Sequence, residues 1–135
     1  MNVQGVHHLA LQVRRLAPMV AFYQGVLGLP VLAEHHAEDG QLRSVWLGLP
    51  EAFLALETVV GEPPGTTPFR NQAPGWFLVA LRIAPAERAS VRAELERAQV
   101  KVEHETRWTL YVRDPEGNRL ALSHHPAAAE GAPDS

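Results

Sequence analysis

Apolar and polar residues alternate in two short segments of the chain, which predicts strands with one buried face. Residues 9–13 read Leu-Ala-Leu-Gln-Val, and residues 79–83 repeat the pattern as Val-Ala-Leu-Arg-Ile. Apolar residues at helical spacing follow each segment, which predicts one helix after each strand. We expect the first helix to end at Gly28 and the second to begin near Pro85.

Three short strands separated by turns are expected after each helix. In the first half they cover residues 30–34, 42–47 and 53–59, with a hairpin turn at 37–40. In the second half they cover residues 101–106, 109–112 and 119–123, with a turn at 114–117. Each half closes on the same Leu-Ala-Leu triplet, at 54–56 and at 120–122. A matching order in both halves indicates two copies of one supersecondary unit.

We therefore predict an α+β fold in which two βαβββ modules form a curved mixed sheet. The modules cover residues 5–60 and 76–125 of a single domain, 1–125. The segment 61–75 is rich in proline, glycine and threonine and is expected to link them. Residues 126–135 are expected to be a disordered tail.

Composition removes several classes of function. The 135 residues contain no cysteine, which excludes disulfides, thiolate metal sites and cysteine nucleophiles. The net charge of −3, with both signs interspersed, gives no basis for binding nucleic acid. No apolar run is long enough to span a membrane, and no secretory signal pattern is present, so we expect a cytoplasmic protein without membrane contacts.

Two motifs resemble those of a known superfamily. Residues 8–13, followed by Phe22-Tyr23 and by Val-Leu-Gly-Leu at 26–29, are similar to the opening of the vicinal oxygen chelate superfamily, which includes glyoxalases, bleomycin resistance proteins and extradiol dioxygenases. Residues 111–118 resemble its closing hairpin. The resemblance, which covers roughly residues 5–125, implies two sheets that curl into a cup for a small molecule, commonly in a homodimer.

The resemblance also implies four positions for the ligands of a divalent metal ion. His8 stands at the first of them. Ala55, Leu78 and Ala121 stand at the other three, and their side chains have no donor atom. We therefore expect the usual metal centre to be largely lost.

Strand alternation indicates which side chains face the cup. If Leu9, Leu11 and Val13 pack on the helix, His8 and Gln12 face the other way. The same parity assigns further residues to the cup: Ser44, Trp46, Phe53, Glu57, Arg82, Tyr111, Arg119 and Ser123.

Two functions from different classes fit these residues. In the first, the protein is a lyase, isomerase or dioxygenase in which His8 and Glu57 are the catalytic pair. They either hold a divalent metal ion together or act directly as acid and base. Two protein ligands bind a metal weakly, so substrate or water would have to complete the coordination shell.

In the second, the protein binds a small oxygen-rich or aromatic molecule without a metal. Trp46, Phe53 and Tyr111 line the cup, and Arg82 or Arg119 holds an anionic group of the ligand. The arginines also have an ordinary structural explanation, which is an ion pair with a nearby glutamate: Glu57, Glu103 or Glu105. The three missing metal ligands favour this second function.

Other histidines and one tryptophan carry no predicted role. His35 and His36 border the turn at 37–40, and His124 and His125 follow the last strand. All four are expected at the surface. Trp108 precedes a strand of the second half and is assigned no function.

Overall fold

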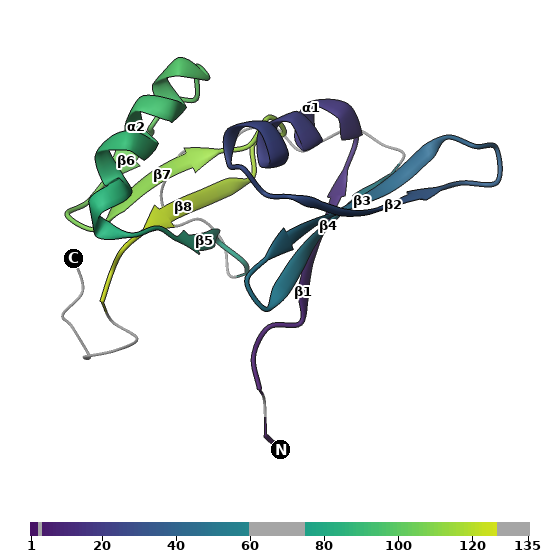
Figure 1. Cartoon of the computed structure of the whole chain (residues 1–135), viewed down its shortest axis with the longest axis horizontal. Coiled ribbons are helices and arrows are strands. Elements are labelled where there is room, and N and C mark those ends of the chain that lie inside the picture. The colour runs from purple at the N-terminus through teal and green to yellow at the C-terminus, as the bar shows by residue number, and fades with distance from the viewer. Residues whose placement is uncertain (3, 60–74, 127–135) are drawn as a thin grey trace. The chain divides into compact units, whose positions relative to one another are not determined.

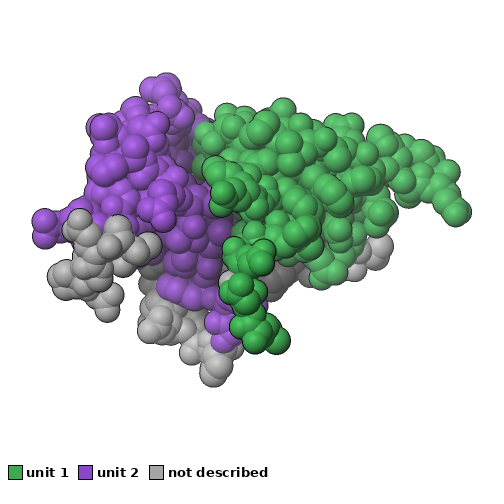
Figure 2. Space-filling view, turned by 60° about the horizontal axis from the view of Figure 1, so that its bottom comes forward, with its two compact units in different colours: residues 1–64 green, residues 65–135 purple. Residues whose placement is uncertain are grey.

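The computed structural model describes residues 1–2, 4–59 and 75–126. The chain divides into two compact units, Met1–Pro64 and Gly65–Ser135, which are coloured separately in Figure 2. The predicted linker (61–75) and tail (126–135) lie outside the described residues, apart from Gly75 and Pro126. Within the described part, no helix has the length and apolar character needed to cross a bilayer.

Unit one contains the first predicted strand, its helix and three further strands. Its elements are β1 (His8–Val13), α1 (Leu16–Val20), the π-helical continuation η1 (Ala21–Val26), β2 (Val31–His36), β3 (Leu42–Leu49) and β4 (Ala52–Thr58). The strands form one sheet in the order β1-β4-β3-β2 (Figure 1). β1 runs parallel to β4, and the other two pairs are antiparallel.

The helix of unit one covers one face of this sheet. Met19, Phe22 and Tyr23 are buried, and α1 packs against β3 and β4. The buried strand residues that alternate with the site positions are Val45, Leu47, Leu54 and Leu56. Because side chains alternate along a strand, the intervening residues project from the face that the helix leaves open. As predicted, the helix ends before Gly28, whose φ of +75° suits a left-handed terminator.

Unit two repeats the order of unit one. Its elements are β5 (Val79–Arg82), the 3-10 turn η2 (Pro85–Glu87), α2 (Arg88–Arg97), β6 (His104–Glu105), β7 (Thr109–Arg113) and β8 (Arg119–Ser123). The strand order is β5-β8-β7-β6, again with the first and last strands parallel. The helical segment begins at Pro85 as predicted, and the Glu87 carboxylate accepts a hydrogen bond from the Ala84 backbone N–H at 3.1 Å.

The two sheets correspond in register as well as in order. Ala10 lies opposite Ala55 in the first, and Ala80 lies opposite Ala121 in the second. Each alanine of a closing Leu-Ala-Leu triplet also pairs with an aromatic residue on its other side, Trp46 or Tyr111. The predicted α+β fold with two βαβββ units, as two four-stranded mixed sheets, is confirmed.

Several predicted strands differ in length from the observed ones, and two of them illustrate the reason. The strand expected at 30–34 extends to His36, because β2 stays paired with β3 as far as Leu42. The strand expected at 101–106 shortens to His104–Glu105. The backbone N–H groups of Glu103 and Thr106 still donate to carbonyls of β7, so hydrogen bonding extends beyond the regular strand.

Candidate functional site

The open face of the sheet in unit one carries three rows of side chains that run across the strands. Register sets the members of each row. The first row is Gln12, Glu57, Ser44 and His35; the second is Ala10, Ala55, Trp46 and Ala33; the third is His8, Phe53 and Gly48. Polar, small and aromatic side chains therefore lie in adjacent rows on one face.

Four rings form a continuous line across this face, one from each strand. His8 stacks on Phe53 with 4.8 Å between ring centroids and an interplanar angle of 6°. Phe53 stacks on Trp46 at 4.5 Å and 21°, and Trp46 contacts His35 at 4.7 Å and 59°. We call these four residues the ring row. The predicted ligand-binding residues Trp46 and Phe53 are thus in direct contact, and His8 lies beside them.

Three polar atoms on the same face are buried without hydrogen bonds. They are the Ser44 hydroxyl, the Trp46 indole Nε1 and the His35 imidazole Nε2, and no described residue is bonded to them. Ser44 is only 2% exposed. Buried polar groups nearly always have a partner, so three such atoms close together mark this face as unusual.

The register does not bring His8 and Glu57 together. His8 lies opposite Phe53, whereas Glu57 lies opposite Gln12, four residues further along the parallel pair. That offset corresponds to about 13 Å along the strand. The His8 ring is also stacked on Phe53, and its Nδ1 lies 2.9 Å from His7 Nδ1. We therefore retain neither a shared metal ion nor an acid–base pair made from these two residues.

Unit two has a corresponding face with a different chemistry. Its central row is Ala80, Ala121, Tyr111 and His104. The Tyr111 and His104 rings lie 5.4 Å apart with an interplanar angle of 38°. Arg82, Ser123 and Thr109 form the next row, in which the Thr109 and Ser123 hydroxyls are 2.8 Å apart.

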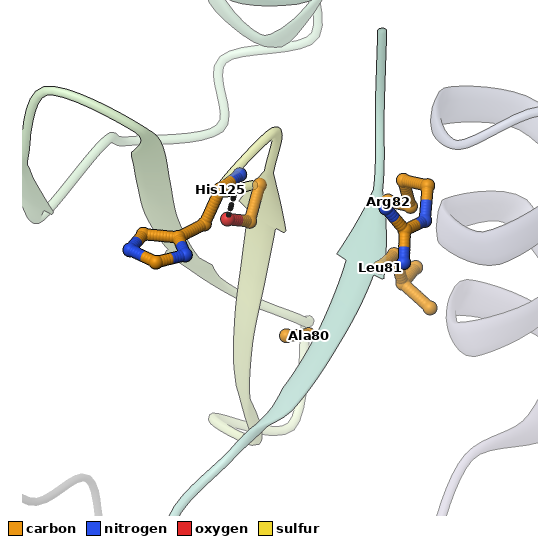
Figure 3. A pocket seen from close by; sticks show the side chains of 5 residues that line it. Ala80, Leu81, Arg82 and His125 are labelled. Carbon is orange, nitrogen blue, oxygen red and sulfur yellow. Dashed lines mark hydrogen bonds between the residues drawn. The ribbon is translucent and has the colours of Figure 1, made fainter. Parts of the chain in front are cut away.

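Arg82 borders a hollow of about 170 Å³ at one end of this face (Figure 3). The other lining residues are Ala80, Leu81, Ser123 and His125. The His125 backbone N–H donates to the Ser123 hydroxyl at 3.2 Å, the dashed line in Figure 3. The residues that line the hollow thus include one with a guanidinium, one with an imidazole ring and one with a hydroxyl group, and the His125 ring points away from Arg82 in Figure 3.

Neighbouring carboxylates are bound to arginines other than Arg82. Glu103 pairs with Arg113 at 2.6 Å, and Glu105 pairs with both Arg88 and Arg92. The predicted alternative, in which Arg82 neutralises Glu103 or Glu105, is therefore not seen among the described ion pairs. The other predicted anion-binding residue, Arg119, lies over the Phe77 ring at 5.1 Å.

Sequence reasoning missed two groups of residues. His35 is half-buried and belongs to the ring row, although its place beside a turn suggested exposure. His124 and His125 contact the Trp108 ring edge-on at 5.5 and 5.8 Å, and Arg107 lies over that ring at 4.5 Å. Alternation along β2 pointed to His35, but irregular pairing between Val31 and Ala33 obscures the parity.

A comparison with protein families agrees with the observed order of elements. The model of the Glyoxalase/Bleomycin resistance protein/Dioxygenase superfamily matches residues 5–122. The chain belongs to this superfamily. No curated protein sequence matches the chain.

Several solved structures are similar to this chain over most of its length. SMU.1112c is 25% identical, with 91% of this chain and 100% of that chain covered and a TM-score of 0.74. A glyoxalase/dioxygenase from Nostoc punctiforme is 20% identical, with 90% of both chains covered and a TM-score of 0.75. A variant of the fosfomycin resistance protein FosX from Listeria monocytogenes, solved with Mn(II) and 1S,2S-dihydroxypropylphosphonic acid, is 13% identical, with 92% and 94% covered and a TM-score of 0.71.

The residues of this superfamily member do not fit the four-ligand metal centre that the resemblance implies. Ala55 and Ala121 are each 2% exposed, and each lies opposite another alanine, so only methyl groups occupy these ligand positions. Leu78, at a third ligand position, also lacks a donor atom. The described residues contain no group of three or more histidine and carboxylate side chains arranged to hold a metal ion. We derive no catalytic step through a metal.

Proposed function

We propose that this chain binds a small aromatic molecule through the ring row, without the usual metal centre of its superfamily. The observation that carries this proposal is the contact between four rings on the sheet face that the helix leaves open. Small-molecule sites are lined mostly by apolar and aromatic side chains with a few polar groups among them. The row next to these rings contains the small side chains of Ala10, Ala33 and Ala55, so it adds little bulk beside them.

Phe53 is the ring on which binding should depend most. It stacks on both His8 and Trp46, so removing it interrupts the ring row at its centre. An aromatic contact contributes about 0.5–1.5 kcal/mol beyond its buried area. We expect the Phe53→Ala variant to bind a flat aromatic probe about tenfold more weakly than the wild type.

Naphthalene is a suitable probe because it is flat and has no hydrogen-bonding group. It would be titrated into ¹⁵N-labelled protein while amide and indole N–H resonances are followed. Trp76→Ala is the matched control, since it removes an aromatic ring that is fully exposed and outside the ring row. Equal affinity of the wild type and Phe53→Ala for naphthalene would remove the basis of the proposal.

We propose a second contact in unit two, where Arg82 binds an anionic group of a ligand. A guanidinium matches carboxylates and phosphates through paired hydrogen bonds. Inorganic phosphate should shift resonances around the hollow, and Arg82→Gln should abolish that shift. Arg97→Gln, at the exposed end of α2, is the control and should change nothing. Tyr111 and Arg119 stay proposed contacts on the same face.

Two further predictions concern the protein as a whole. We propose a cytoplasmic location, which cell fractionation would measure. We also propose homodimeric assembly, which the superfamily resemblance implies.

A further inference from the structure

The three buried polar atoms of unit one lie in one small patch. Ser44 and Trp46 are two residues apart on β3 and project from the same face, and His35 lies opposite Ser44 on β2. The His35 and Trp46 rings are in contact at 4.7 Å. We call these three residues the polar patch. It shares Trp46 and His35 with the ring row, and Ser44 is its one member outside that row.

Folding alone gives no reason for the polar patch. Burying a hydroxyl, an indole N–H or an imidazole nitrogen without a partner costs folding free energy. Alanine in place of Ser44 would fill much the same space without that cost. Ser44 is only 2% exposed and its hydroxyl has no partner among the described residues, which points to a partner in a bound molecule.

The chemistry of the three atoms restricts what that partner can be. An indole N–H only donates, so Trp46 requires an acceptor. The Ser44 hydroxyl can donate or accept, and His35 Nε2 does either according to its tautomer. A molecule that forms hydrogen bonds with all three atoms must carry an acceptor for the Trp46 N–H. It can also carry a donor next to that acceptor, for Ser44 or His35. Because Trp46 also contacts Phe53, that molecule meets further aromatic rings next to the polar patch.

We propose that the polar patch recognises the hydrogen-bonding edge of an aromatic ligand, with an acceptor next to a donor in the plane of the ring. Cyclic amides fused to an aromatic ring have this chemistry. The inference rests on the proposed function of the ring row and adds the polar half of the ligand. The ring row binds the flat surface of the ligand. The polar patch discriminates among flat ligands by their hydrogen-bonding groups.

The test compares two probes of nearly equal size. Carbostyril is a two-ring lactam with a carbonyl beside an N–H, and naphthalene has the same two-ring outline without polar atoms. Two added neutral hydrogen bonds should make carbostyril bind the wild type about tenfold more tightly than naphthalene. Affinities would come from ¹⁵N titrations, in which the Trp46 indole N–H resonance, assigned by its loss in Trp46→Phe, reports the bond directly.

The variants separate the polar patch from the ring row. Ser44→Ala should reduce the preference for carbostyril to about threefold, with the affinity for naphthalene nearly unchanged. Trp46→Phe removes the indole N–H and should lower the same preference, measured as the ratio of the two affinities within that variant. Equal binding of both probes by the wild type would overturn the inference and leave the ring-row proposal standing. Binding of neither probe would overturn both.

A second measurement needs no ligand. Ser44→Ala should leave the thermal midpoint unchanged or raise it, because it removes a buried hydroxyl that has no partner among the described residues. Ser123→Ala is the matched control, since that hydroxyl bonds Thr109 and the His125 backbone, and its loss should lower the midpoint. A midpoint for Ser44→Ala as low as that of Ser123→Ala would overturn the inference.

Discussion

Ala55 lies between Ala10 and Trp46 in the first sheet, and Ala121 lies between Ala80 and Tyr111 in the second. Both are almost fully buried, so each position provides only a methyl group enclosed by neighbouring residues. A carboxylate there would be removed from water, at a cost that only a bound cation or several hydrogen bonds could offset. At the residue scale, the two matched alanines are the reason to expect ligand binding without the usual metal centre.

If the usual metal centre is absent, any stabilisation of the protein by metal ions should not depend on His8. The rise in Tm on adding Mn²⁺, Ni²⁺ or Zn²⁺ should be the same for the wild type and for His8→Ala, because a single imidazole binds these ions weakly. The measurement is a thermal melt of protein without a histidine tag. A His8-dependent rise above about 3 °C, or roughly 1 kcal/mol for a domain of this size, would contradict the prediction.

At the scale of elements, strand pairing decides which side chains meet. β1 pairs with β4 in parallel, so His8 meets Phe53 rather than Glu57. β3 then brings Trp46 beside Ala55, where its ring can reach both Phe53 and His35. The ring row is therefore a property of four strands in a fixed register, and no single strand contains it.

The turn between β7 and β8 depends on one carboxylate. Asp114 is 4% exposed and accepts hydrogen bonds from the Glu116 N–H and from the backbone and side chain of Asn118. Asp114→Ala should lower the free energy of unfolding by about 2–3 kcal/mol, because hydrogen bonds to a charged acceptor are lost. Urea denaturation would measure the loss.

Asp39 provides the control, because it occupies the hairpin turn of unit one. It is exposed and accepts one backbone hydrogen bond, from Gln41, at 2.9 Å. Asp39→Ala should therefore cost clearly less than Asp114→Ala. Equal losses would mean that burial and bond number do not account for the stability of the second turn.

At the scale of the whole molecule, large apolar side chains remain exposed on both units. Leu32 and Val59 are exposed in unit one, and Trp76 and Phe77 in unit two. Exposed large apolar residues are available to an interface between proteins.

Because the superfamily resemblance implies a homodimer, we expect a mass in light scattering near twice the chain mass of 14.8 kDa. Dilution should shift the population toward the single chain, because association depends on concentration. A mass of 14.8 kDa at every concentration tested would contradict the prediction.

Local patterns in the sequence determined the elements and their duplication. Alternation at 9–13 and 79–83, helical spacing after each, and the Leu-Ala-Leu closing triplets were sufficient to predict two βαβββ units. Strand parity also assigned Trp46, Phe53 and Ser44 to the open face correctly. These features follow from residues close together in the chain, whose side-chain directions depend only on backbone periodicity.

Only the tertiary structure decided which of these residues meet. Strands β1 and β4 are distant in sequence, and shifting their alignment by two residues would keep every side chain on its face. Parity therefore could not show that His8 stacks on Phe53 while Glu57 lies opposite Gln12. The same holds for His35, whose contact with Trp46 depends on a pairing irregularity in β2. The sequence thus determined the faces, and the packing of helix and strands determined the register that makes one of them a site.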